Sequence, residues 1–197
     1  MAEFKMLGGV PCLDFANTVD WRKGEPRELL NSAPNLIDWA EQAGTVTGRE
    51  AQELRGEAAR SPEEAESFYR RATALREAVY RTFKAHADGA SPSEADLDLL
   101  SHELAEALSH TTLTKEGSGF TLRFRGAANE KMIWAITQSA AQILTGPHLS
   151  RVKECGDPRC GWLFLDTSRN GTRRWCSMSD CGNRNKARAH YSRRQTS

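Results

Sequence analysis

Apolar residues in the first 150 positions recur mostly at spacings of three and four, which is the spacing of one face of a helix. The longest stripe predicts a helix that begins after the cap Ser61, with Pro62 in its first turn, and ends near Gly89. This stripe runs for about five turns, through Ala65, Phe68, Ala72, Leu75, Val79 and Phe83.

Cap and stop residues predict further helices on either side of this one. One begins at Ser32 and stops at Gly44, and a short polar helix opens with a capping box at Thr47. A further helix is predicted after Ser91, with apolar residues at Leu97, Leu100, Leu104 and Leu108. The last helix ends at Gly146 and Pro147, and its apolar face carries Met132, Ile136, Ala140 and Ile143.

An alternation of period two predicts one β-hairpin before the last of these helices. Phe120, Leu122 and Phe124 alternate with polar residues, and "EGSG" at 116–119 supplies the turn. We therefore expect residues 1–150 to form a mainly α-helical domain with one hairpin.

The opening segment "GGVPCLDFANTVDWR" at 8–22 follows neither period. Asp14, Asn17 and Asp20 lie near turns, where such side chains usually bond to the backbone, so we interpret them as structural. A pocket lined by them is the alternative. Cys12 stands alone, and we expect it to be a small buried apolar side chain.

The composition indicates a globular protein of the cytoplasm. Apolar residues make up 39% of the 197 positions, the mean hydropathy is −0.62, and no apolar run approaches the ~20 residues that span a bilayer. The first ten residues lack the basic and apolar regions of a signal peptide. Cytoplasmic thiols stay reduced, so clustered cysteines favour metal binding over disulfides.

The formal net charge of +1 hides an asymmetry along the chain. Residues 151–197 hold 11 Lys or Arg and 4 Asp or Glu, a balance of +7, whereas residues 1–150 hold 16 and 22, a balance of −6. A basic end on an acidic body indicates a module that faces a polyanion and is carried by a separate domain.

Four of the five cysteines lie in this basic segment. Cys155 and Cys160 form one C-x4-C pair, and Cys176 and Cys181 form a second after fifteen residues. Zn²⁺ favours four ligands in a tetrahedron, and two close thiolate pairs supply them. We predict one structural zinc ion.

Other roles for the four cysteines fit less well. Disulfides need an oxidising compartment, and an iron–sulfur cluster usually takes a tighter spacing. Catalytic zinc keeps one position open, which four cysteines close. We also find no nucleophile–base pair and no glycine-rich phosphate loop, so we do not expect an enzyme.

The surroundings of the cysteines predict a small α+β finger at residues 151–197. "GDPR" suits a tight knuckle, "GWLFLDTS" a strand, and Asn170–Gly171 a turn that leads into a return strand to Cys176. A helix follows Cys181. Knuckle, hairpin and helix in this order resemble a treble clef, and the metal would supply much of the folding free energy of so small a module.

Basic residues flank the predicted metal site. We expect Arg173, Arg174, Arg184, Lys186, Arg188, Arg193 and Arg194 to contact phosphates, with Arg169 nearby on the hairpin. Because Arg184 and Arg188 are four apart on one helix face, their repulsion is most easily explained if phosphates neutralise it. The alternative is a solvated basic helix, or one that lies against the acidic domain.

The segment "CGDPRCGWLFLDTSRNGTRRWCSMSDCGNRNKARAHYSRR" closely resembles the finger of the bacterial CGNR zinc-finger family, whose motif stands at Cys181, Gly182, Asn183 and Arg184. The opening "GGVPCLDFANTVDWR" looks like the start of the ABATE domain that precedes this finger. The resemblance implies a zinc-bound, nucleic-acid-binding finger on a helical domain, in a transcription regulator that is associated with stress in some members.

Together these observations favour a zinc-dependent DNA-binding regulator. Residues 1–150 would sense a ligand, form a homodimer or bind another protein, and a ligand pocket near Trp21 or Trp39 is one form of this. RNA binding is an alternative, as is a protein-interaction module in which the zinc only stabilises the fold. We expect no association with membranes.

Overall fold

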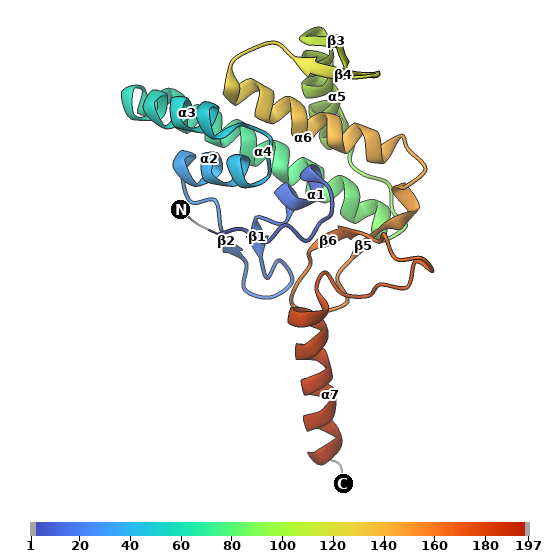
Figure 1. Ribbon diagram of the computed structural model, residues 1–197. Coiled ribbons are helices and arrows are strands. Elements are labelled where there is room, and N and C mark those ends of the chain that lie inside the picture. The colour runs from blue at the N-terminus through green and yellow to red at the C-terminus, as the bar shows by residue number, and fades with distance from the viewer. Residues whose placement is uncertain (1–2, 196–197) are drawn as a thin grey trace.

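The computed structural model describes residues 3–195, without the side chains of His190, Arg193 and Gln195. Most of the elements are helices, the short strands come in pairs between them, and Figure 1 shows a helical body from which the last helix extends. The elements are α1 Pro11–Ala16, β1 Val19–Asp20, β2 Arg27–Glu28, α2 Ala33–Gln42, α3 Gly48–Arg60, α4 Pro62–Ala87, α5 Glu94–Ser109, β3 Thr111–Glu116, β4 Gly119–Phe124, α6 Ala128–Leu144, η1 Leu149–Arg151, β5 Val152–Glu154, β6 Leu163–Leu165, η2 Met178–Gly182 and α7 Asn183–Gln195.

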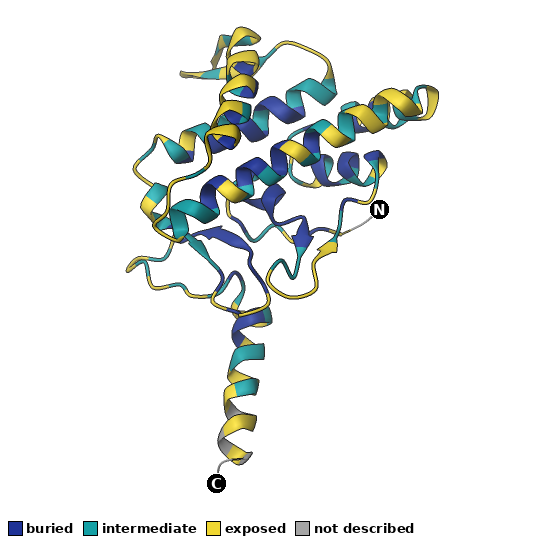
Figure 2. Ribbon diagram, turned by 180° about the vertical axis from the view of Figure 1, so that it is seen from behind, coloured by how far each residue is buried: buried dark blue, intermediate teal, exposed yellow. Residues whose placement is uncertain are grey.

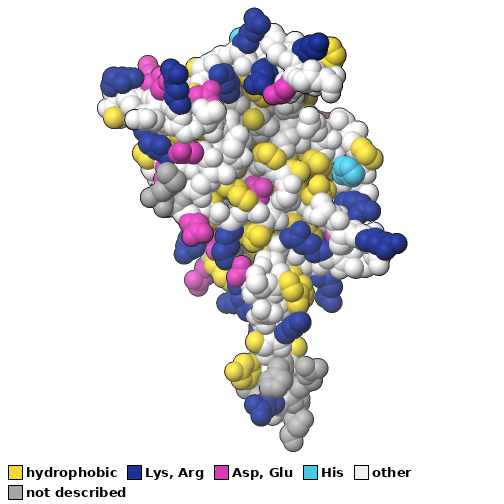
Figure 3. All heavy atoms as spheres, in the orientation of Figure 1, with side chains coloured by type: hydrophobic (Ala, Val, Ile, Leu, Met, Phe, Trp, Pro, Cys, Tyr) yellow, Lys and Arg dark blue, Asp and Glu magenta, His cyan; other side chains and the backbone are white. Residues whose placement is uncertain are grey.

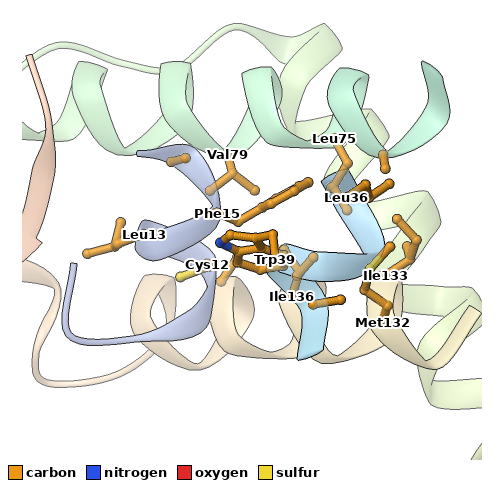
Figure 4. Close-up of a cluster of buried hydrophobic side chains, with 14 of the residues drawn as sticks. Cys12, Leu13, Phe15, Leu36, Trp39, Leu75, Val79, Met132, Ile133 and Ile136 are labelled. Carbon is orange, nitrogen blue, oxygen red and sulfur yellow. The ribbon is translucent and has the colours of Figure 1, made fainter. Parts of the chain in front are cut away.

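The core of the body lies between α4 and α6, where the short helix α1 is inserted between them. Figure 4 shows Cys12, Phe15 and Trp39 meeting there, and the Phe15 and Trp39 rings are 4.7 Å apart between centroids. Cys12 is fully buried, as predicted. The apolar faces predicted for α4 and α6 point into this core, which Figure 2 shows as the dark-blue sides of both helices.

Two of the predicted helix starts are confirmed in detail. The Ser32 hydroxyl accepts the N–H of Asn35 at the start of α2. Thr47 and Glu50 form both bonds of the capping box at the start of α3. Each cap satisfies N–H groups that the first helical turn leaves without intrahelical partners.

Two other helix starts differ from the prediction. Ser61 precedes α4, but its hydroxyl makes no capping bond, because this single residue also ends α3 and its N–H bonds to the Glu57 carbonyl. Helix α5 begins two residues later than predicted: Ser93, not Ser91, accepts the N–H of Asp96.

Helix α5 packs through only part of its predicted leucine stripe. Leu100 is buried in the core, but Leu97 and Leu108 are 40% and 56% exposed, whereas Asp96 and Glu103 are buried. The reason lies on α4, where Arg81 and Arg71 reach these carboxylates at 2.5 and 2.7 Å. A buried acidic side chain is tolerated when a bidentate guanidinium pairs with it.

The predicted hairpin is present as β3 and β4, with Leu113 opposite Leu122. Only its root joins the core, where Phe124 lies 5.8 Å from Trp134 between ring centroids. Phe120 at the tip is 71% exposed.

A small sheet of β5 and β6 replaces the hairpin predicted between the cysteine pairs. β6 pairs antiparallel with β5, which precedes Cys155, and 172–176 form no strand. The polar run "SRNGTRR" has no alternating apolar residues to bury, whereas Val152, Leu163 and Leu165 enter the core of the body. The basic segment is thus packed onto the body by its first strands.

Asp14 and Asn17 act on the backbone, as the structural interpretation predicts. Asp14 accepts the N–H of Gly8 at 2.7 Å, and Asn17 bonds to the backbone of Leu163. Asp20 accepts the N–H of Trp21 and also lines a hollow beside the cysteines. Within residues 3–195 no helix is both long and apolar enough to cross a bilayer.

We expect Asp14 to make stability depend on pH. Burial raises the pKa of its carboxyl to about 6, so the folded protein binds a proton that the unfolded chain releases. Stability relative to an Asp14→Asn variant should therefore increase by about 1 kcal/mol as the pH falls from 7.5 to 5.5. Urea unfolding of both proteins measures this difference, and a difference that does not change with pH would contradict it.

Candidate functional site

The four predicted cysteine ligands come together at one point. All four Sγ atoms lie within 4.8 Å of one another and are buried, and all five cysteines of the chain are free thiols. The Sγ atoms of Cys160 and Cys176 are 3.7 Å apart, and those of Cys176 and Cys181 are 3.6 Å apart. Zn–S bonds of about 2.3 Å at tetrahedral angles give an S···S distance of about 3.8 Å, so the site fits such an ion.

The chemistry of the donors also favours a cation. Hydrogen bonds from the Cys160 and Cys176 thiols lower the pKa of Cys155, while the same bonds raise the pKa of those two donors. Burial raises the pKa of Cys181. Four thiols crowded together cannot all ionise unless a positive ion offsets their charge.

Backbone geometry fixes the two pairs of cysteines. Cys155 and Cys160 flank a knuckle that follows β5, and the Cys155 N–H bonds to the Trp162 carbonyl at 2.8 Å. The N–H of Cys176 points at the Cys155 sulfur, at 3.4 Å. Cys181 lies in the π-helical turn η2, which leads directly into α7. The site therefore joins the knuckle to the start of α7.

The N-terminal segment completes the finger. The Asn17 side chain donates to the Leu163 carbonyl at 2.8 Å and accepts its N–H at 2.9 Å, as a neighbouring strand would. Trp162 donates its indole N–H to the Val19 carbonyl at 2.9 Å. Leu7 packs against the apolar cluster around the cysteines. Residues from the two ends of the chain thus share one small core.

Asp157, in the knuckle, anchors the basic helix. Its side chain has no exposed surface. Its Oδ2 accepts from Arg184 at 3.3 Å, Asn185 at 2.9 Å and Arg188 at 2.8 Å. Burial alone would raise the pKa of Asp157, but the N–H of Arg159 and the Arg188 guanidinium hold that pKa below its ordinary value.

This contact explains the spacing of Arg184 and Arg188 within the fold. Both guanidinium groups meet one buried carboxylate, which offsets part of the repulsion between them, and contact of either residue with phosphate stays a prediction. Asn185 has a part in the same anchor, because it also donates to the Cys181 carbonyl at 2.8 Å.

The other predicted phosphate contacts fall into two groups. Arg173 lies over the Phe164 ring and donates to the carbonyls of Trp175 and Cys176. The side chains of Arg174, Lys186 and Arg194 are exposed, as is Arg169. The predicted contact at Arg193 lies outside the described side chains.

Helix α7 does not lie against the acidic domain. Figure 1 shows it extending away from the body beyond its first turns. It carries no Asp or Glu, and on the face seen in Figure 3 its coloured charges are Lys and Arg alone. The alternative in which the helix covers the first domain is therefore wrong.

Sequence reasoning missed the roles of Asp157 and Asn17. Asp157 carried a signal, because an acidic residue inside a knuckle stands close to the helix that follows the last cysteine. No signal in the sequence identified Leu163 as the partner of Asn17, because the two residues are 146 positions apart.

We expect one metal ion per chain. Elemental analysis of the reduced, purified protein should find a stoichiometry near one for the wild type and for Cys12→Ala, since Cys12 is remote from the site. Cys176→Ser should lose the ion, because two of the short Sγ contacts include Cys176. Equal metal content in all three proteins would contradict the assignment.

Loss of the Asp157 charge should destabilise the metal-loaded protein. Removing one member of a buried charged network leaves its partners uncompensated, so we expect Asp157→Asn to lower the unfolding free energy by about 2 kcal/mol. Asp180→Asn is the matched control: its partner Lys5 is 59% exposed, and such pairs contribute about 0.5 kcal/mol. Urea unfolding compares the two, and losses of equal size would count against the anchor.

Comparison with known families agrees with the two parts of the chain. Residues 9–147 match the ABATE family, described as "Putative stress-induced transcription regulator", and residues 151–194 match the CGNR zinc finger. A search of curated proteins found no match. With more than half of its length covered by the first of these families, the chain belongs to the ABATE family and ends in a CGNR zinc finger.

Proposed function

We propose that this protein is a zinc-dependent regulator that binds duplex DNA through α7. The observation that carries the proposal is the position of this helix, which extends from the body, has no acidic residue and exposes Lys186 and Arg194. No acidic residue of the helix offsets these exposed charges, whereas a polyanion would neutralise them.

In this proposal the ion at the four cysteines is zinc, and its role is structural. A tetrathiolate site leaves no position open for water or substrate, so its function is to hold the knuckle and the start of α7 together. The activity is then binding, not catalysis.

The basic residues divide between anchoring and binding. Arg184 and Arg188 are committed to Asp157, and Arg173 to backbone carbonyls. The side chains free to reach phosphate are the exposed ones, of which the structure describes Arg169, Arg174, Lys186 and Arg194. With four such contacts, log K should fall with log salt at a slope of about −4.

The shape of α7 favours DNA over RNA. A helix about 10 Å across fits the major groove of B-DNA, which is about 12 Å wide. The major groove of an RNA duplex is too narrow for it. Residues 1–150 would then carry the regulatory input, as a ligand site, a homodimer contact or a partner surface, in keeping with the description of the ABATE family.

The test distinguishes binding through the exposed cations of the finger from an effect of the protein's net charge. A triple variant, Arg174→Ala, Lys186→Ala and Arg194→Ala, should bind a 20-bp duplex at least about tenfold more weakly and with a salt slope shallower by about 3. Fluorescence anisotropy at three salt concentrations measures both quantities.

The control removes the same charge from the body, with Arg49→Ala, Arg60→Ala and Arg70→Ala, all exposed residues of α3 and α4. It should keep wild-type affinity and slope. If both triple variants lowered the affinity for the duplex equally, the proposal would be wrong. Displacement of the duplex by RNA at lower concentration than by DNA would assign the helix to RNA instead.

A further inference from the structure

Trp21 has an unusual backbone conformation. Among residues 3–195 it is the one non-glycine residue with a positive φ, of 56°, a region that bulky side chains rarely adopt. The Asp20 carboxylate accepts its N–H at 3.0 Å, and its carbonyl accepts the N–H of Gly24 at 2.7 Å. Such a conformation persists only where the surroundings require it, and it turns the indole of the β1–β2 loop toward the finger.

The indole lies between two arginines of the finger. The Arg184 guanidinium is 4.3 Å from the ring centroid, and the Arg159 guanidinium is 5.0 Å from it. Tryptophan is the aromatic residue that attracts a cation most strongly. Arg184 belongs to the first turn of α7 and Arg159 to the knuckle, so one ring of the first domain contacts both.

The loop that carries Trp21 is fixed to the knuckle. The Lys23 N–H bonds to the Arg159 carbonyl at 3.2 Å. Gly161, at φ 75°, has no room for a side chain, since a Cβ there would lie 2.9 Å from the Cβ of Arg22. These contacts join the loop to the knuckle and place Trp21 beside Arg184.

Arg184 is therefore held on two sides, by the Trp21 ring and by the Asp157 carboxylate. Trp21 also borders two hollows of 180 and 550 Å³, so truncation of the ring would open space beside Arg184. In the described part of the chain no second aromatic ring lies over Arg184.

We infer that Trp21 is the positioning residue through which the first domain sets the direction of α7. Its effect on DNA binding rests on the proposed function, whereas its effect on the helix does not. Asp157 ties α7 to the knuckle, which the Lys23–Arg159 and Trp162–Val19 bonds join to the body. Trp21 adds a direct contact between the first domain and α7, so that the exposed cations of α7 are presented at a fixed angle to those of the 166–175 loop.

The experiment measures the direction of α7 by residual dipolar couplings of backbone amides in the zinc-loaded full chain. In the wild type, the α7 amides should fit the alignment tensor of the body. In Trp21→Ala and Trp21→Gly they should no longer fit it, while metal content stays at one ion. Trp21→Phe, which keeps an aromatic face, should restore the fit.

The glycine variant separates the ring from the backbone, because glycine adopts a positive φ without strain. If Trp21→Ala loses the fit and Trp21→Gly keeps it, backbone strain is responsible and the inference fails. The inference also fails if the α7 amides fit the alignment tensor of the body in both Trp21→Ala and Trp21→Gly. A matched control is Tyr80→Leu, which removes the ring under Arg22 in the same loop; Arg22 keeps its bonds to Glu77 and Ala16. Loss of the fit in this control would attribute the effect to general loosening of the loop.

Affinity for the 20-bp duplex is the second readout. Trp21→Ala should bind about tenfold more weakly, and Trp21→Phe should bind nearly as the wild type does. If the wild type does not bind the duplex, the proposed function fails, while the dipolar couplings still decide whether Trp21 directs α7.

Discussion

A carboxylate with no contact to water must be surrounded by donors, and this requirement at Asp157 organises the finger. The nearest cations belong to the helix that follows the last cysteine, so burying Asp157 determines where that helix starts and which face it turns inward. The four thiols bring the knuckle and the helix together, and the carboxylate adds a second point of contact between them.

This requirement divides the basic residues of the segment by role. In the sequence, Arg184 and Arg188 on one helix face look most like a binding surface. In the structure, both pair with the buried Asp157. Those that stay available, Lys186 and Arg194, lie on other faces of α7. The net charge of +7 for residues 151–197 therefore does not identify which of its cations can reach a partner. Each of its four acidic residues is paired, two of them with lysines of the body.

Much of this structure could be predicted from local signals. The capping box at Thr47 and the apolar stripe of α4 need only neighbours within a few positions, and the cysteine spacing needs only the geometry of one ion. The errors arose where the partner is distant. The helical spacing of the α5 leucines correctly indicated Leu100, but Leu97 and Leu108 are exposed, because Arg71 and Arg81 of another helix bring Asp96 and Glu103 inward. The return strand after Gly171 was expected from a turn signal, but β6 finds its partner in β5, ahead of the knuckle.

The pairing of Asn17 with Leu163 has a consequence for how the chain reaches its native state. The two residues are 146 positions apart, so this contact cannot form until the ribosome has released most of the protein. Helix α1, adjacent to Asn17, lies in the centre of the body between α4 and α6. Val152, Leu163 and Leu165 of the last segment belong to the core of the body, so this core is complete only when that segment arrives. The loop closure that such distant contacts require predicts a slow last step during or after synthesis.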